Sequence, residues 1–368
     1  MDLRAFNATD IAQSSTSGVL VQLLARDHDV AENNYSDIDA AFFLGACGEN
    51  KVFALSDAQV GDLNHWFVIG DIHGDFYALH KLTARIASLC PDFRLLFLGD
   101  LVDRGPHAEA CFLYIAKLAT ALPGRVIWLA GNHDIGLCFE EASGQFSSDV
   151  APSEFVSYLN ADDQNIIRRK ELGLKFIQVA EQLPRAVLFP GGLLATHGGI
   201  PLSDLHKQLP SPVSTEEGYA WLNSQNALKD FTWTRISRYR KKLPNRYSTG
   251  CQYGYADFAA FCLVTKEFFP VTGLLTGHEH PDEGFDSHRE WSTNRALTLT
   301  GFGFGHYYGS AEAFLDGYRP NLFFARLNLE AYPQITNFPV DRQDLQLFFE
   351  KHLAAHFLTV AENNAKLI

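Results

Sequence analysis

Three segments of the sequence share one pattern: FVIGDIHGD at 67–75, LLFLGDLVDRGP at 95–106 and VIWLAGNHD at 126–134. In each segment, a short run of aliphatic and aromatic residues ends at a glycine or shortly before it, and Asp or Asn follows that glycine. Such runs are too short and too rich in β-branched residues to be helices, so they predict buried strands that end in polar loops. The glycines allow sharp turns, which lets the polar side chains after them gather at one point.

Amphipathic helices are predicted between these strands. Apolar residues recur at helical spacing over 76–89 and again over 108–118. Strands that alternate with helices of this length are typical of a parallel sheet, in which functional groups gather beyond the carboxyl ends of the strands. The sequence therefore predicts an α/β fold with its active site at the C-terminal ends of the strands.

The remaining elements are predicted by the same rules. We expect a largely helical, polar cap over 134–182, and a hairpin from RAVLF at 185–189 to LLATHGG at 193–199. Further predictions are a hairpin between 40–46 and 51–55, a helix over 255–268, and strands within 271–280, 296–305 and 322–329. A last helix over 341–364 is expected to turn these residues inward: Leu345, Phe349, Leu353, Phe357 and Val360.

These patterns divide the chain into three parts. We predict an N-terminal extension over 1–60, a main domain over 61–340 and a C-terminal helix over 341–368. The main domain carries two expected inserts, at about 140–185 and 203–250. We expect both inserts to shape the rim of the active site.

Composition restricts the class of protein. The 368 residues carry 30 basic and 43 acidic side chains, a net charge of −13, which argues against nucleic acid as the main partner. The six cysteines form no C-x-x-C pair, which indicates reduced thiols. The first twenty residues lack a continuous apolar run, and no run approaches membrane-spanning length. We expect a cytoplasmic protein, or one delivered by a specialised secretion system, with no membrane partner; the sequence does not specify an oligomeric state.

The polar loops offer a metal-ligand set of oxygen and nitrogen donors without thiolates. Its members are Asp71, His73, Asp100, Asn132 and two further loop histidines. Such donors suit manganese, iron or zinc better than they suit a structural zinc site. An Asp that bridges two ions holds them roughly 3.5 to 4 Å apart, the separation at which a pair activates water and binds a phosphoryl group. The set predicts phosphoester hydrolysis.

Five motifs together resemble a known family. GDIHG, GDLVDRG, GNHD, THGG and GHEH occur in the order found in the metallophosphoesterase, or calcineurin-like, superfamily, and the DRG resembles its PPP-type phosphatases. The resemblance runs from Gly70 to His280. Any one motif alone has an ordinary explanation, such as a turn or a packed core histidine. The resemblance implies a layered β-sandwich flanked by helices.

The resemblance also implies roles for the metal ligands. Asp71 and His73 would hold the first ion, and Asp100 would bridge. His280 matches the last histidine of a GHxH pattern, a first-ion ligand in many superfamily members that PPP enzymes lack. The second ion would be held by Asn132, His197 and His278. The implied cofactors are two divalent ions, Mn²⁺ first or else Fe or Zn, and the implied reaction is direct attack of a metal-bound hydroxide on phosphorus.

Four further residues are implied in catalysis and substrate binding. His133 resembles the general acid that protonates the leaving oxygen, and Asp103 the carboxylate that orients it. Arg104 matches a phosphate-binding arginine, whose planar guanidinium can bind two phosphate oxygens at once. Arg235, in DFTWTR, is our candidate for a second such arginine. The alternative is that Arg235 begins a solvated basic run that continues to Arg246.

Departures from the family pattern bear on the substrate. The chain has GNHD where eukaryotic Ser/Thr members have GNHE, Ala130 where they have Arg, and no SAPNY segment. In this it resembles bacterial-type members, which include protein phosphatases and dinucleoside polyphosphate hydrolases. The resemblance implies a metal-dependent phosphatase acting on a phosphorylated protein or peptide at Ser/Thr or Tyr. The alternatives are a diadenosine tetraphosphate-type hydrolase and a noncatalytic scaffold, although scaffolds typically lose the acid histidine that His133 supplies here.

Overall fold

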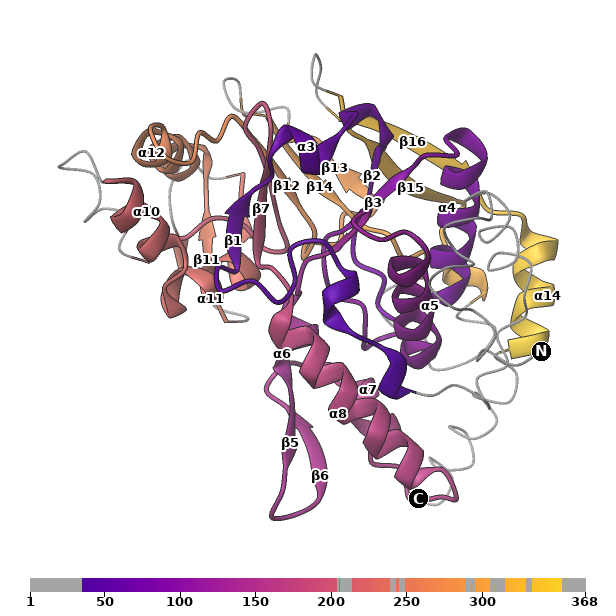
Figure 1. Cartoon of the computed structure of the whole chain (residues 1–368). Coiled ribbons are helices and arrows are strands. Elements are labelled where there is room, and N and C mark those ends of the chain that lie inside the picture. Colours follow the sequence, from indigo (N-terminus) through magenta and orange to yellow (C-terminus); the bar gives the residue numbers. More distant parts are fainter. Residues whose placement is uncertain are drawn as a thin grey trace.

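The computed structural model describes residues 35–203, 205, 214–238, 243–244, 249–288, 291, 295–304, 315–328 and 333–352. Within these residues, two sheets pack face to face and helices cover their outer faces (Figure 1). The predicted layered sandwich flanked by helices is confirmed. None of the described helices combines the length and apolar character that crossing a membrane requires.

The first sheet contains the three strands that the opening motifs predict. In the described chain its order is β16-β15-β2-β3-β4, and β2, β3 and β4 run parallel. β15 is antiparallel to both β2 and β16, and β16 was not predicted. The strand bounds are β2 (Trp66–Ile69), β3 (Arg94–Phe97), β4 (Val126–Trp128), β15 (Asn321–Arg326) and β16 (Gln334–Pro339). The predicted helices between the parallel strands are α4 (Phe76–Leu89) and α5 (Ala108–Ala121).

The second sheet brings the later motifs to the same end of the sandwich. Its order among the described strands is β1-β7-β8-β12-β14-β13. The predicted hairpin is confirmed as β7 paired antiparallel with β8, and β12 lies parallel to both β8 and β14. The bounds are β1 (Val52–Ala54), β7 (Ala186–Phe189), β8 (Leu193–Thr196), β12 (Gly273–Thr276), β13 (Phe285–Asp286) and β14 (Arg295–Leu299).

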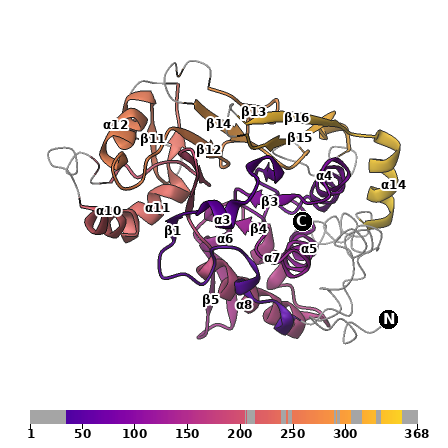
Figure 2. The same cartoon turned by 45° about the horizontal axis from the view of Figure 1, so that its top comes forward.

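Alternating side chains join the layers. Successive side chains of β3 and of the residue after it point to opposite faces of the sheet. Leu96 and Leu98 pack with Leu275 and Leu297 of the second sheet. Leu95 and Phe97 lie on the other face and pack under α4 and α5. The outer face of the second sheet is covered by α10 (Thr215–Leu222), α11 (Gln225–Trp233) and α12 (Tyr255–Thr265), as Figure 2 shows. Both faces of each sheet are therefore buried over most of their area. Because neither face of such a strand meets solvent, the strand sequences are continuous apolar runs.

The segment after the third motif is less helical than predicted. It contains α6 (Asn132–Gly136), a hairpin of β5 (Leu137–Glu140) and β6 (Gln145–Ser148), then α7 (Glu154–Leu159) and α8 (Ile166–Gln182). The hairpin contradicts the helical prediction because Phe139 and Phe146 pair across it, with ring centroids 4.9 Å apart, and Gly144 turns it at φ +68°. The hairpin and α8 extend away from the two sheets (Figure 1).

The predicted hairpin between 40–46 and 51–55 is wrong. Residues Ala40–Phe42 form a short 3₁₀-helix, η4, instead of a strand. β1 pairs in parallel with β7 and not with the segment that precedes it in the sequence. Val52 is fully buried in the second sheet, so tertiary packing outweighs the local hairpin signal. The division of the chain at residue 60 stays a prediction, although β1 belongs to the second sheet.

The last helix begins close to the predicted position. It is α14 (Arg342–His352), with Leu345 and Phe349 buried as expected. Leu353, Phe357 and Val360 lie outside the described residues. The remaining elements among the described residues are η3 (Tyr35–Asp37), α3 (Asp57–Val60), η5 (Leu63–His65), β9 (Arg235–Ile236), β10 (Leu243–Pro244) and β11 (Cys251–Tyr253).

Phe176 packs α8 against the rest of the domain. Its side chain is fully buried, and its ring lies 5.1 Å from that of Phe112, 5.9 Å from Trp128 and 5.4 Å from Phe155. Phe176→Ala is expected to lower the free energy of unfolding by about 3–5 kcal/mol in urea titration, because a large cavity remains. Leu174→Ala, on the same helix but 41% exposed, is the control and should change it by less than about 0.5 kcal/mol. Equal losses would show that Phe176 does not anchor α8.

Candidate metal centre

The motif loops approach one another too closely for side chains at their glycines. Gly99 has φ +107°, and a Cβ there would lie 2.7 Å from the Gly131 nitrogen and 2.8 Å from His197 Nδ1. A Cβ on Gly277 would lie 2.1 Å from Asp71 Oδ1. These glycines let loops from both sheets converge at one end of the sandwich.

Backbone strain is concentrated in the same loops. Residues with side chains rarely adopt positive φ, a conformation that costs about 1–3 kcal/mol and is usually found where function requires it. Among the described non-glycine residues, positive φ occurs mostly at predicted site positions: His73 (48°), Asp100 (50°), Asp103 (68°), Arg104 (64°) and His278 (65°). The loops are thus held in one particular arrangement by the packing around them.

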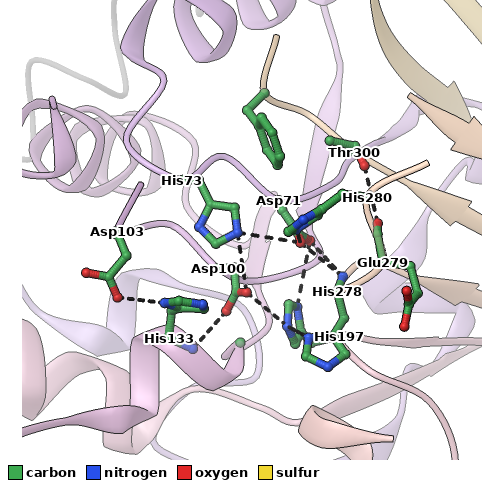
Figure 3. A network of polar contacts seen from close by, with 12 residues as sticks. Asp71, His73, Asp100, Asp103, His133, His197, His278, Glu279, His280 and Thr300 are labelled. Carbon is green, nitrogen blue, oxygen red and sulfur yellow. Dashed lines mark hydrogen bonds and ion pairs between the residues drawn. The ribbon is translucent and has the colours of Figure 1, made fainter. Parts of the chain in front are cut away.

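Asp71, His73 and His280 form a first group of side chains (Figure 3). Asp71 Oδ2 lies 3.0 Å from His280 Nε2 and 4.0 Å from His73 Nε2. Asp71 also accepts hydrogen bonds from the backbone N–H of His278, at 3.0 Å to each of its oxygens, which fixes its orientation. The candidate ligand atoms of this group all lie within 4.8 Å of one another.

Asp100, His197 and His278 form a second group, which Asn132 joins. His197 Nε2 lies 3.3 Å from Asp100 Oδ2, 3.0 Å from Asn132 Oδ1 and 3.1 Å from His278 Nδ1. Asp100 Oδ2 is also 3.7 Å from His73 Nε2, so this carboxylate reaches both groups. Asp100 therefore connects the two groups.

The hydrogen bonds of the histidines decide which ring nitrogen faces the carboxylates. His73 Nδ1 donates to the Val102 carbonyl and His197 Nδ1 to the Leu98 carbonyl, each at 2.9 Å, so Nε2 is in each ring the nitrogen that faces Asp100. The Nε2 atoms of His73 and His278 are buried and have no hydrogen-bond partner among the described residues. Buried polar atoms rarely stay unsatisfied, so divalent cations fit this donor set.

Burial and charge act on these groups in opposite directions. Burial lowers the pKa of His73 and of His278 well below the usual value and that of His280 to about 3, which keeps their rings neutral. For His197, burial is outweighed by the charge of Asp100, which raises the pKa to about 9. Although burial opposes it, His197 and His133 hold the pKa of Asp100 well below its usual range.

His133 and Asp103 form a hydrogen-bonded pair beside the two groups. His133 Nδ1 lies 2.7 Å from Asp103 Oδ2, and the other Asp103 oxygen accepts from the Phe155 backbone N–H at 2.9 Å. The His133 backbone N–H donates to Asp100 Oδ1 at 2.9 Å. A carboxylate thus fixes the His133 ring next to the candidate bridging residue.

A cavity of about 440 Å³ opens over this arrangement. Arg104 and Arg235 both line it, and Arg235 donates to Glu279 Oε1 at 3.0 Å and to the His278 carbonyl at 3.4 Å. Arg235 therefore lies at the edge of the cavity, partly buried and paired with Glu279. Residues 239–242 and 245–246 of the basic run after it lie outside the described residues. Both predicted inserts reach the cavity, through Asp149, Val150, Ala151, Trp233 and Thr249.

Two residues of the site were missed by sequence reasoning. Asp134 is fully buried and accepts hydrogen bonds from Leu101 N at 2.8 Å and Gly131 N at 2.9 Å, which ties the second motif loop to the third. Glu279 pairs with Arg235. Both residues lie inside motifs already quoted, Asp134 as the last residue of GNHD and Glu279 as the third of GHEH. Each was a carboxylate inside a motif to which no role had been assigned, and this could have identified it as a site residue.

Comparisons with known proteins agree with this geometry. The family model of the calcineurin-like phosphoesterases matches residues 67–282, more than half of the chain. A protein phosphatase 2A catalytic subunit of Dictyostelium discoideum is 42% identical over 85 residues, 23% of this chain and 27% of that protein. A serine/threonine-protein phosphatase of Caenorhabditis elegans is 24% identical over 241 residues, 64% of this chain and 47% of that protein. The chain thus spans less than half the length of these curated relatives.

The fold has a counterpart among solved structures. A protein serine/threonine phosphatase from Saccharomyces cerevisiae, described as similar to human phosphatase PP5, superposes with a TM-score of 0.55 at 18% identity, over 89% of both chains. The sequence match places the five motifs inside the family model, and the structural match extends over the surrounding sandwich. The chain belongs to the calcineurin-like phosphoesterase family.

Proposed function

We propose that this chain is a metal-dependent phosphatase that hydrolyses phosphomonoesters on Ser/Thr or Tyr residues of phosphorylated proteins. The observation that carries the proposal is the pair of ligand groups joined at Asp100, next to the hydrogen-bonded His133 and Asp103. Phosphoesterases of this family use divalent metals, and the relatives described above are named as serine/threonine phosphatases or as a catalytic part of one. Both facts support the assignment.

The two groups would hold two divalent ions. Asp71, His73 and His280 would hold one ion, Asp100 would contact both, and the other would be held by Asn132, His197 and His278. Oxygen and nitrogen donors without thiolate favour Mn²⁺, with Fe or Zn as the alternatives. When bound, such ions lower the pKa of water and offset negative charge on a phosphoryl group.

The remaining residues would bind the phosphate and move a proton. Because Asp103 accepts from His133 Nδ1–H, Nε2 is the ring nitrogen left to protonate the leaving oxygen. Arg104 and Arg235 line the cavity and would bind the phosphoryl oxygens, with Glu279 holding Arg235 in place. These groups would stabilise charge that develops in the transition state.

The test is a metal-reconstitution assay with a substrate panel. Metal-stripped protein is expected to be inactive, and Mn²⁺, Fe²⁺ or Zn²⁺ added singly should restore hydrolysis of matched phosphoserine, phosphothreonine and phosphotyrosine peptides. Diadenosine tetraphosphate is the competing substrate. Faster turnover of this dinucleotide than of every peptide would contradict the proposed substrate class, and full activity of the stripped protein would contradict the metal requirement.

A further inference from the structure

A second cavity of about 320 Å³ lies beside the candidate metal centre; we call it the side cavity. Its walls come from residues 104–110 at the start of α5, from α7 and from the first turn of α8. Arg104 lines this cavity as well as the one over the metal centre. The side cavity therefore adjoins the place where the substrate phosphate would bind.

The start of α7 connects the side cavity to candidate catalytic residues. Glu154, on the cavity wall, accepts a hydrogen bond from the Arg104 backbone N–H at 2.8 Å. Phe155, also on the wall, donates its backbone N–H to Asp103 at 2.9 Å. One wall of the side cavity is thus hydrogen-bonded to the loop that carries Asp103 and Arg104.

The cationic groups of α8 on the wall already make bonds within the chain. Arg168 donates to Glu109 at 2.7 Å and to the Tyr35 hydroxyl at 2.9 Å. Arg169 donates to Asp163 at 2.6 Å and to the Ala161 carbonyl at 3.0 Å. The ion pairs with Glu109 and Asp163 partly offset the positive charge that an acidic ligand would otherwise meet.

Apolar residues make up much of the remaining wall. Pro106, Ala108, Ala110 and Phe155 line the cavity, together with the polar residues His107, Tyr158 and Asn165. The exposed carboxylate of Glu154 would repel an acidic group placed there. The chemistry of the wall therefore selects an uncharged, apolar side chain.

We propose that the side cavity is a substrate subsite for an apolar side chain that flanks the phosphorylated residue of the peptide. The proposal rests on the proposed phosphatase function. The volume falls in the range of ligand pockets, about 300–1,000 Å³. A peptide advances about 3.5 Å per residue, so a peptide whose phosphate contacts Arg104 has neighbouring side chains close to the side cavity.

The test is a comparison of phosphopeptides that carry Leu or Gly at each position from three residues before to three after the phosphorylated one. The wild type is expected to prefer Leu at one of these positions by about tenfold or more in kcat/KM. Ala110→Phe, which fills the cavity from a half-exposed position of α5, should abolish that preference. Ala110→Leu should reduce it partly. All values are normalised to turnover of p-nitrophenyl phosphate, which has no flanking side chains.

The control is Ala121→Phe, at the other end of the same helix and outside both cavities, which should keep the preference. The proposal is overturned if the wild type prefers Leu at no position, or if Ala110→Phe retains the preference. Failure of the phosphatase function gives a different result, because the wild type would then hydrolyse none of the phosphopeptides.

Discussion

Asp100→Asn is expected to lower metal binding by the protein and to abolish the proposed phosphatase activity. Asp100 is almost fully buried, and its Oδ2 lies 3.7 Å from His73 Nε2 and 3.3 Å from His197 Nε2. The amide oxygen of Asn can still accept the hydrogen bond from His133 N, but its NH₂ group then replaces Oδ2. An amide NH₂ carries no charge and offers no lone pair to a cation.

The expected loss of metal affinity follows from the position of Asp100 between the two ligand groups. Loss of a partner that merely orients a ligand lowers metal affinity by about 10–100-fold, so loss of a shared ligand should exceed 100-fold. Elemental analysis after gel filtration should find about two ions in each wild-type chain and fewer than one in the variant. Asp39→Asn, an exposed helix N-cap where Asn is equally suitable, is the control. A variant that retained both ions would refute the bridging assignment.

His133→Asn is expected to reduce turnover by about 10²–10⁴ on substrates with poor leaving groups, while the metal content stays unchanged. His133 pairs with Asp103 at 2.7 Å, and its contact with Asp100 is made by the backbone N–H, which the substitution keeps. The variant therefore loses the proton donor without losing a metal ligand.

The dependence of the rate loss on the leaving group distinguishes a general-acid role of His133 from a structural one. Phosphoserine peptide needs a proton on its leaving oxygen much more than p-nitrophenyl phosphate does, so the loss should be far smaller for the latter. His65→Asn, at a partly exposed position outside the cavity, should behave as the wild type. An equal loss on both substrates would indicate that His133 is not the acid.

The parallel core could be predicted because its signals are local. Each of β2, β3 and β4 is a short apolar run that leads to a glycine and then a polar residue, and α4 begins at the predicted residue. The gathering of Asp71, His73, Asp100 and Asn132 follows from the same rule, since strand ends at one edge of a sheet lie together. The ligand roles of His197, His278 and His280 were implied by the family resemblance. The structure brings every predicted ligand into the two groups or into contact with them.

What the sequence did not predict depends on contacts between distant segments. β1 pairs with β7, more than 130 positions later, where the local pattern favoured a hairpin. The pairing of Arg235 with Glu279 requires a loop from the second sheet to be placed first. The β5–β6 hairpin was missed because its apolar residues are few, and their pairing only becomes evident once Phe139 and Phe146 face each other.

The most direct test of the proposed two-ion centre is anomalous diffraction from crystals grown with Mn²⁺. We expect two strong anomalous peaks with Asp100 between them. One peak should lie among Asp71, His73 and His280, and the other among Asn132, His197 and His278. No peak at this site, or peaks only elsewhere on the protein, would contradict the two-ion centre.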